Sequence, residues 1–135
     1  MSGYLDEDEF NRWLKNARYT LKSARADVNA GFYSWACFKA QQAAEFAVKA
    51  YLRGIGEDSF GHSVSLLLKK ANFDESLINI AKKIDRYYIP TRYTDAWSDG
   101  SPEDYYSSDD AEEAISSAES IISEVENRWK SFRSA

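Results

Sequence analysis

The chain has 135 residues, a length that suits one domain with its own core, so we expect residues 1–135 to form a single domain. Its net charge of −5 argues against indiscriminate binding to nucleic acid, and its one cysteine, Cys37, excludes an internal disulfide or a thiolate metal cluster built by one chain. Because no segment offers the roughly 18 uncharged apolar residues of a membrane span and the acidic start has no apolar run, we expect a cytoplasmic protein without a signal peptide or membrane contact.

Helical periodicity dominates the first segment. Apolar residues recur every three or four positions between Phe10 and Val28, which predicts a helix over about 7–29. Its bases are Arg12, Lys15, Arg18, Lys22 and Arg25. No acid lies among these bases, whereas residues 93–127 carry many acids and no base. The two segments either pack side by side and neutralise each other, or the bases form a groove for an anionic ligand.

A second helix is predicted over about 32–53, after a break at residues 29–31. It is rich in alanine and large aromatic residues, which is typical of a central bundle helix or of a dimer face. Its polar side chains either line a cleft or form a buried hydrogen-bond network between helices. They are Gln41, Gln42, Glu45 and Lys49, of which the last two have the spacing of a helix ion pair.

Three further helices follow, and no strand pattern of useful length appears. Ser63 is a plausible N-cap for a short third helix, and Asp74 for a fourth that ends near Tyr87 or Tyr88, since Pro90 disfavours helical geometry at the residue before it. Residues 89–106 hold prolines and large aromatic side chains, which predicts a long ordered loop. A fifth helix opens near Ser107 with acids in its first turn. The expected fold class is all-α.

Three blocks of the sequence carry a resemblance to a known family. They are GFYSWACFKAQQAAEFAVKAYL in the second helix, GHSVSLLL at the start of the third, and YIPTRYTDA after the fourth. In this order they are similar to the G-x-Y-x-x-A-x-F-x-x-Q-Q-A-A-E-x-A-x-K-A, G-H-S and Y-I-P-T-R-Y-P-D-A blocks of the HEPN (higher eukaryotes and prokaryotes nucleotide-binding) family, with Thr94 in place of the usual proline. The resemblance runs from about residue 10 to 127. It implies a five-helix up-and-down bundle.

The resemblance also implies partners and activities. HEPN domains usually pair as homodimers and often accompany a minimal nucleotidyltransferase encoded beside them. Some branches are ribonuclease toxins of toxin–antitoxin pairs, with an Arg-x(4–6)-His motif in a cleft between protomers. That motif is missing here, because the only histidine, His62, lies nine positions after Arg53 and none follows Arg86 or Arg92.

We therefore expect a non-enzymatic module that binds a nucleotide or docks onto a nucleotidyltransferase. Two alternatives stay open. One is a diverged ribonuclease in which Arg92 and His62 meet in space, and the other is a purely structural dimerisation module.

Arg92 is the leading candidate for ligand contact. Its guanidinium matches phosphate in a planar, bidentate way, and the Thr91 hydroxyl and the Tyr93 ring are its neighbours in the chain. The alternative is an ion pair with Asp95 or Asp85 that fixes the loop to the bundle.

For each of the other candidate residues, a structural role is the alternative to a functional one. The tyrosines and Trp97 of this segment serve a ligand pocket, loop packing or an interface, and His62 is either a general acid or base or a residue that ties a loop down. No metal ligand, catalytic residue or cofactor is predicted, and the expected ligand is a nucleotide or RNA. The predicted ligand-binding residues are Arg92, Tyr93, Thr91, Tyr88, His62, Glu45 and Lys49.

Overall fold

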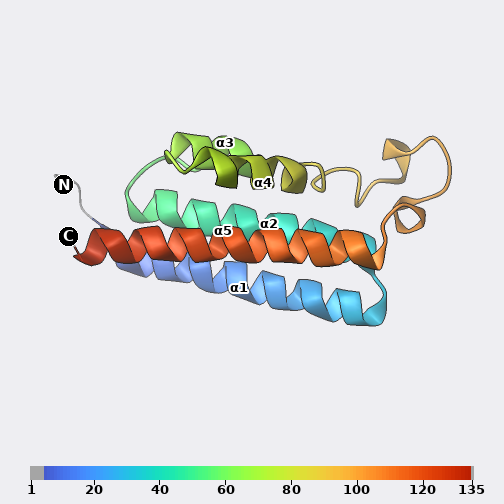
Figure 1. Ribbon diagram of the computed structural model, residues 1–135, viewed down its shortest axis with the longest axis horizontal. Coiled ribbons are helices and arrows are strands. Elements are labelled where there is room, and N and C mark those ends of the chain that lie inside the picture. The colour runs from blue at the N-terminus through green and yellow to red at the C-terminus, as the bar shows by residue number, and fades with distance from the viewer. Residues whose placement is uncertain (1–4, 135) are drawn as a thin grey trace.

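Five α-helices make up the computed structural model, which describes residues 5–134 (Figure 1). They are α1 (Glu7–Ala30), α2 (Tyr33–Gly54), α3 (Val64–Lys70), α4 (Glu75–Asp85) and α5 (Ser108–Ser134), with two 3-10 turns, η1 (Thr94–Ala96) and η2 (Pro102–Asp104), between α4 and α5. The described residues form no β-strand. The predicted all-α class and the count of five helices are confirmed.

The helices alternate along the long axis of the molecule. The chain runs out along α1, back along α2, out again along α4 and back along α5, so that α1 begins and α5 ends at the same end of the bundle (Figure 1). The short α3 starts beside the end of α4, and these two helices form a pair that covers α2. This is the predicted up-and-down order. Within residues 5–134, no helix combines the length and the apolar character that a membrane span requires.

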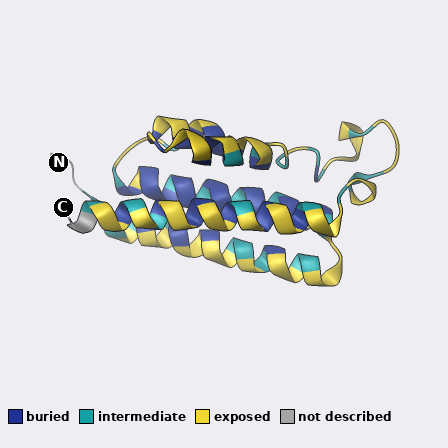
Figure 2. Cartoon of the chain, viewed as in Figure 1, coloured by how far each residue is buried: buried dark blue, intermediate teal, exposed yellow. Residues whose placement is uncertain are grey.

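The α2 helix is the centre of the bundle and is buried along most of its length (Figure 2). Its fully buried positions are mostly alanines, whose small side chains let α1 and α5 pack closely against it. The sequence predicted either a central bundle helix or a dimer face, and the structure shows α2 as the central helix of the bundle.

Opposite charges join α1 to α5. The Arg25 guanidinium lies 2.8 Å from the Glu119 carboxylate, and Arg18 pairs with Glu126 in the same way. Basic α1 and acidic α5 therefore lie side by side, which confirms the first of the two predicted explanations for the uneven charge. Both arginines and Glu119 are exposed and Glu126 is half-buried, so each pair contributes little to stability and mainly fixes which faces meet.

Gly54, the last residue of α2, is required for the approach of α5. A Cβ atom at this position would lie 2.6 Å from the ring of Trp129, which is stacked on Phe10 at 4.2 Å between ring centres. The missing side chain lets an aromatic pair from α1 and α5 close this end of the core.

The Glu9 carboxylate gathers three donors from α1 and α2. Its Oε1 accepts hydrogen bonds from Arg12 Nη2 at 2.9 Å, Trp13 Nε1 at 3.0 Å and Arg53 Nε at 2.9 Å. The hydrogen bonds from Arg12 and then Arg53 lower the pKa of Glu9 from 4.5 to about 2. This carboxylate links the beginning of α1 to the end of α2.

Replacing Glu9 by glutamine should therefore destabilise the protein in a pH-dependent way. Because the folded-state pKa of Glu9 is depressed, the stability it contributes is fully present above about pH 4.5 and is lost as the pH falls through about 2. Urea unfolding of the wild type and Glu9→Gln across this range measures the difference, with exposed Glu112→Gln on α5 as the control. A destabilisation of equal size at pH 7 and near pH 2 would contradict this assignment.

Candidate functional site

A buried carboxylate on α2 organises the polar residues predicted for this helix. Glu45 is only 3% exposed, and its oxygens accept from Gln41 Nε2 at 3.2 Å and from Lys49 Nζ at 3.1 Å. Gln42 donates to the Gln41 side-chain oxygen at 2.7 Å. Of the two predicted arrangements, the structure shows the buried hydrogen-bond network, together with the predicted Glu45–Lys49 ion pair.

The same network holds the loop that carries His62. Nδ1 of His62 lies 3.3 Å from each Glu45 oxygen, and the Gln41 amide donates to the His62 carbonyl at 2.9 Å. Since a carboxylate only accepts, the hydrogen of a neutral ring sits on Nδ1, and Nε2 is left with its lone pair. The His62 side chain is 57% exposed. His62 therefore ties the loop down and also presents one ring nitrogen to solvent.

Tyr88 continues this arrangement outward from His62. The two rings are stacked, with centres 4.6 Å apart and planes inclined by 16°. A flat ring over an imidazole restricts its rotation and covers one of its faces. The histidine is thus positioned by α2 on one side and by the segment after α4 on the other.

Arg92 lies among aromatic rings rather than beside a carboxylate. Its Cζ atom is 4.2 Å from the ring centre of Phe38, 4.7 Å from that of Tyr88 and 4.9 Å from that of Tyr93. Its Nε donates to the Tyr88 carbonyl at 2.9 Å. Cation–π attraction accounts for the position of the guanidinium, and its terminal nitrogens have no acceptor among residues 5–134.

The alternative in which Arg92 pairs with Asp85 or Asp95 is wrong in this structure. The Asp85 carboxylate instead accepts from the first amides of α3, Val64 N at 2.6 Å and Ser65 N at 3.2 Å. This cap, together with the Ser63 cap of the same helix, holds the start of α3 beside the end of α4. In the described part of the chain, Arg92 makes no ion pair with Asp95 either.

The loop after α4 is ordered by its own side chains, as the sequence predicted. Thr91 is buried and donates to the Tyr87 carbonyl at 2.6 Å, so its hydroxyl anchors the loop. Trp97 Nε1 donates to the Pro90 carbonyl at 2.8 Å, and the Trp97 ring is stacked on Tyr105 at 3.9 Å. Helix α4 ends at Asp85, slightly before the predicted Tyr87 or Tyr88, because the chain tightens there into i to i−3 hydrogen bonds.

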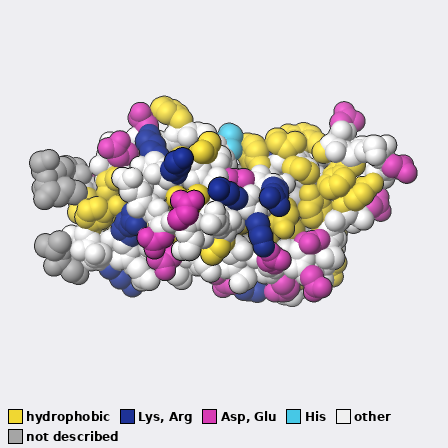
Figure 3. Space-filling view, turned by 45° about the horizontal axis from the view of Figure 1, so that its top comes forward, with side chains coloured by type: hydrophobic (Ala, Val, Ile, Leu, Met, Phe, Trp, Pro, Cys, Tyr) yellow, Lys and Arg dark blue, Asp and Glu magenta, His cyan; other side chains and the backbone are white. Residues whose placement is uncertain are grey.

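Most of the predicted ligand-binding residues meet on one surface, which we call the Arg92 patch and which consists of Phe38, His62, Tyr88, Arg92 and Tyr93. Glu45 and Lys49 lie beneath His62. Figure 3 shows hydrophobic side chains gathered on one half of this face, beside the histidine and several Lys and Arg side chains. Phe38 was missing from the sequence prediction. Its helical spacing from Gln41 and Glu45 is the signal that places it on the same face of α2.

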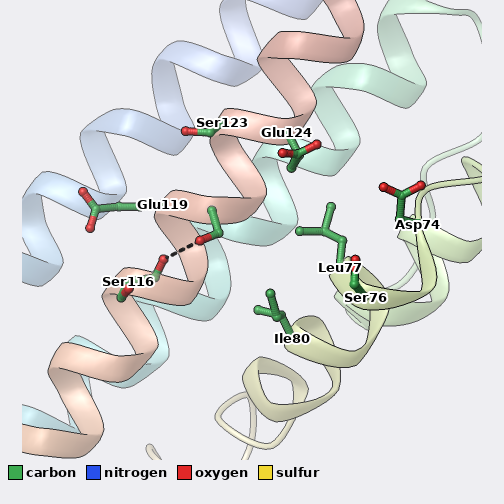
Figure 4. A pocket seen from close by; sticks show the side chains of 9 residues that line it. Asp74, Ser76, Leu77, Ile80, Ser116, Glu119, Ser123 and Glu124 are labelled. Carbon is green, nitrogen blue, oxygen red and sulfur yellow. Dashed lines mark hydrogen bonds between the residues drawn. The ribbon is translucent and has the colours of Figure 1, made fainter.

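A cavity of about 640 Å³ lies elsewhere, between α4 and α5. Figure 4 shows the residues that line it, which are Asp74, Ser76, Leu77, Ile80, Ser116, Glu119, Ser120, Ser123 and Glu124. Its lining residues include three carboxylates and no base, although the Glu119 side chain points toward α1, where it pairs with Arg25 (Figure 4). The space is therefore unsuited to an anionic ligand.

Removing the Glu45 carboxylate should destabilise the fold. Glu45→Ala leaves the Lys49 ammonium, 13% exposed, without its counter-ion and releases His62, and breaking a buried pair costs about 3 kcal/mol. Chemical denaturation measures the loss, with Glu112→Ala on the exposed side of α5 as the control. The double variant Glu45→Leu/Lys49→Met should recover most of it. If Glu45→Ala unfolds at the wild-type denaturant concentration, the network does not hold this region.

Comparison with known proteins agrees with the resemblance seen in the sequence. The family model described as "HEPN domain" matches residues 10–128. The crystal structure of TT1696 from Thermus thermophilus is similar to this chain, with 41% identity, a TM-score of 0.84, and coverage of 87% of this chain and 96% of that one. No curated protein gives a significant match.

Two further solved structures are similar. ST0689, described as an archaeal HEPN homologue, is 38% identical with a TM-score of 0.78, and 88% of this chain and 96% of that one are covered. A HEPN domain protein, TM0613 from Thermotoga maritima, is 35% identical with a TM-score of 0.71, and the coverage is 88% and 98%. The chain belongs to the HEPN domain family.

Proposed function

We propose that this HEPN domain binds a nucleotide or a similar phosphate-bearing ligand at the Arg92 patch. The observation that carries the proposal is the state of Arg92 itself. Three rings hold its guanidinium in place, yet no carboxylate of residues 5–134 neutralises it. A fixed guanidinium with unused terminal N–H groups suits the bidentate binding of a phosphate.

The rings around Arg92 suit the rest of a nucleotide. Tyr93 is 50% exposed and His62 presents an edge to solvent, so aromatic surface lies next to the cation. Bases of any identity stack on such surfaces, which supports binding without strong sequence preference. The acidic cavity between α4 and α5 offers neither feature.

The proposal includes protein partners and a place of action. Exposed apolar side chains flank the Arg92 patch, namely Phe32, Trp35 and Ile89. Apolar surface of this kind suits association between two copies of the chain or with a nucleotidyltransferase subunit. The protein would act in the cytoplasm.

Arg92→Ala should weaken ligand binding without unfolding the bundle. A ligand that binds only the folded protein raises the melting temperature by an amount that increases with the logarithm of its concentration above the Kd. Losing a bidentate charged contact weakens binding about tenfold or more. Thermal-shift titrations with a panel of nucleotides and short RNAs measure this. Arg86→Ala, an exposed arginine at the end of α4, is the matched control. A loss of melting temperature in Arg92→Ala with an unchanged response to ligand would show that Arg92 is structural only.

A second candidate function, RNA cleavage, is supported by one observation. His62 is oriented by a buried carboxylate through Nδ1 and leaves Nε2 free, which is how a general base is held. Arg92, on the same Tyr88 ring, would stabilise the charge that develops on the phosphate.

A metal-free cleavage assay on short RNAs tests this candidate. Activity of the wild type that is lost in His62→Ala, with the melting temperature retained, would favour it. RNA left intact at high protein concentration would rule it out.

A further inference from the structure

A cleft of about 330 Å³ lies between the first turn of α2 and the loop that follows α4. Residues 31–35 line one side, Thr91 and Arg92 the next, and residues 101–103 close it. Arg92 therefore belongs both to the cleft and to the Arg92 patch, whereas the other residues that line the cleft are not part of the patch.

The first turn of α2 enters this cleft without a cap. Its N-cap residue, Phe32, has no side-chain acceptor, and no acid lies in the first turn. The backbone N–H groups of Tyr33, Ser34 and Trp35 find no acceptor among residues 5–134. By contrast, Asp6 caps α1 and Ser63 caps α3. The start of a long helix carries partial positive charge, and here it is left uncompensated.

Ser34 gives an independent sign that a ligand belongs here. The residue is only 6% exposed, it lines the cleft, and its hydroxyl makes no hydrogen bond within the described residues. A hydroxyl without a protein partner is left to bond solvent or a ligand, and a helical serine usually bonds a carbonyl four residues back. The Ser34 hydroxyl makes no such bond, and Ser34 lines the cleft beside the uncapped first turn of α2.

Arg92 completes the set of donors. Its Nε is occupied by the Tyr88 carbonyl, whereas its terminal nitrogens are free and the residue lines the cleft. The residues that carry these amides, the hydroxyl and the guanidinium thus line one space, and each of these groups is a donor to an anion. The only carboxylate among the lining residues is that of Glu103, which is exposed.

We propose that this cleft binds the terminal phosphate of a phosphate monoester through the α2 amides, the Ser34 hydroxyl and Arg92. A phosphate offers three oxygens to donors that approach from several directions, whereas a carboxylate offers two in one plane. The inference deepens the proposed function and rests on it. The Arg92 patch holds the base, and the start of α2 holds the phosphate.

Amide NMR spectroscopy tests the cleft directly, with inorganic phosphate as the probe and acetate at equal ionic strength as the comparison. The cross-peaks of Tyr33, Ser34 and Trp35 should move with phosphate and saturate, and they should respond weakly to acetate. Ser34→Ala should weaken phosphate binding about tenfold, since one hydrogen bond to a charged group is lost. Ser76→Ala, the same position in the first turn of α4, is the matched control.

A gain of affinity provides a readout that structural damage cannot imitate. Glu103→Gln removes the one carboxylate among the residues that line the cleft and should tighten phosphate binding a few-fold. Three results would each overturn the inference. They are α2 amides that do not respond to phosphate, an equal response of these amides to acetate, and an affinity for phosphate that is unchanged in Ser34→Ala.

A third titration, with adenosine, separates this inference from the proposed function. Adenosine has a base and no phosphate, so its shifts should fall on Tyr88 and Tyr93. If adenosine binds and the α2 amides do not respond to phosphate, the proposed phosphate site in the cleft is wrong, whereas the proposed nucleotide binding at the Arg92 patch is still supported. If the α2 amides respond to phosphate but neither adenosine nor a nucleotide binds, the phosphate site in the cleft is supported and the proposed nucleotide binding is wrong.

Discussion

The Glu45 carboxylate inside the bundle is the constraint on which the surrounding structure depends. A charge that is almost fully buried must be hydrogen-bonded and paired, because its desolvation is otherwise too costly. Gln41 and Lys49 meet this need from α2 itself, and His62 meets it from the loop before α3. The loop is thereby fixed to the central helix, and α3 starts at the place where Asp85 can cap it.

The outer part of the site follows from this inner part. His62, once fixed, gives Tyr88 a ring to stack on, and Tyr88 with Phe38 and Tyr93 gives the Arg92 guanidinium its position. The positive charge of Arg92 is placed by rings and one carbonyl, none of which carries a negative charge. A cation held in this way keeps its attraction for an anionic ligand. An aspartate partner would have cancelled it, and the absence of that pair among the described residues supports the proposed contact with a ligand.

Much of the fold was predictable because it is local in origin. The apolar period of 3.6 residues predicted both ends of α1 and α2 within about two residues, and the Ser63 N-cap predicted the start of α3. The pairing of α1 with α5 was predictable only as one of two alternatives. The deciding fact is that Arg18 and Arg25 are spaced along α1 as Glu119 and Glu126 are along antiparallel α5.

The site was less predictable because it is built from contacts between distant segments. The three blocks of family resemblance drew attention to His62 and Arg92 without showing how they meet. No local pattern indicates that Asp85 caps a helix that begins 21 residues earlier in the chain, or that Phe38 supports Arg92. The open first turn of α2 was also missed, since its free amides matter only once the loop 89–106 folds over them.

A crystal structure of the protein grown with a nucleoside monophosphate tests the central claim, that Arg92 is held in place for an anionic ligand. We expect density for a base against the rings of the Arg92 patch, with the phosphate bonded to the guanidinium. Two results would contradict this claim. In one, the ligand binds only in the cavity between α4 and α5, and in the other, the Arg92 patch is empty and the Arg92 side chain pairs with a carboxylate.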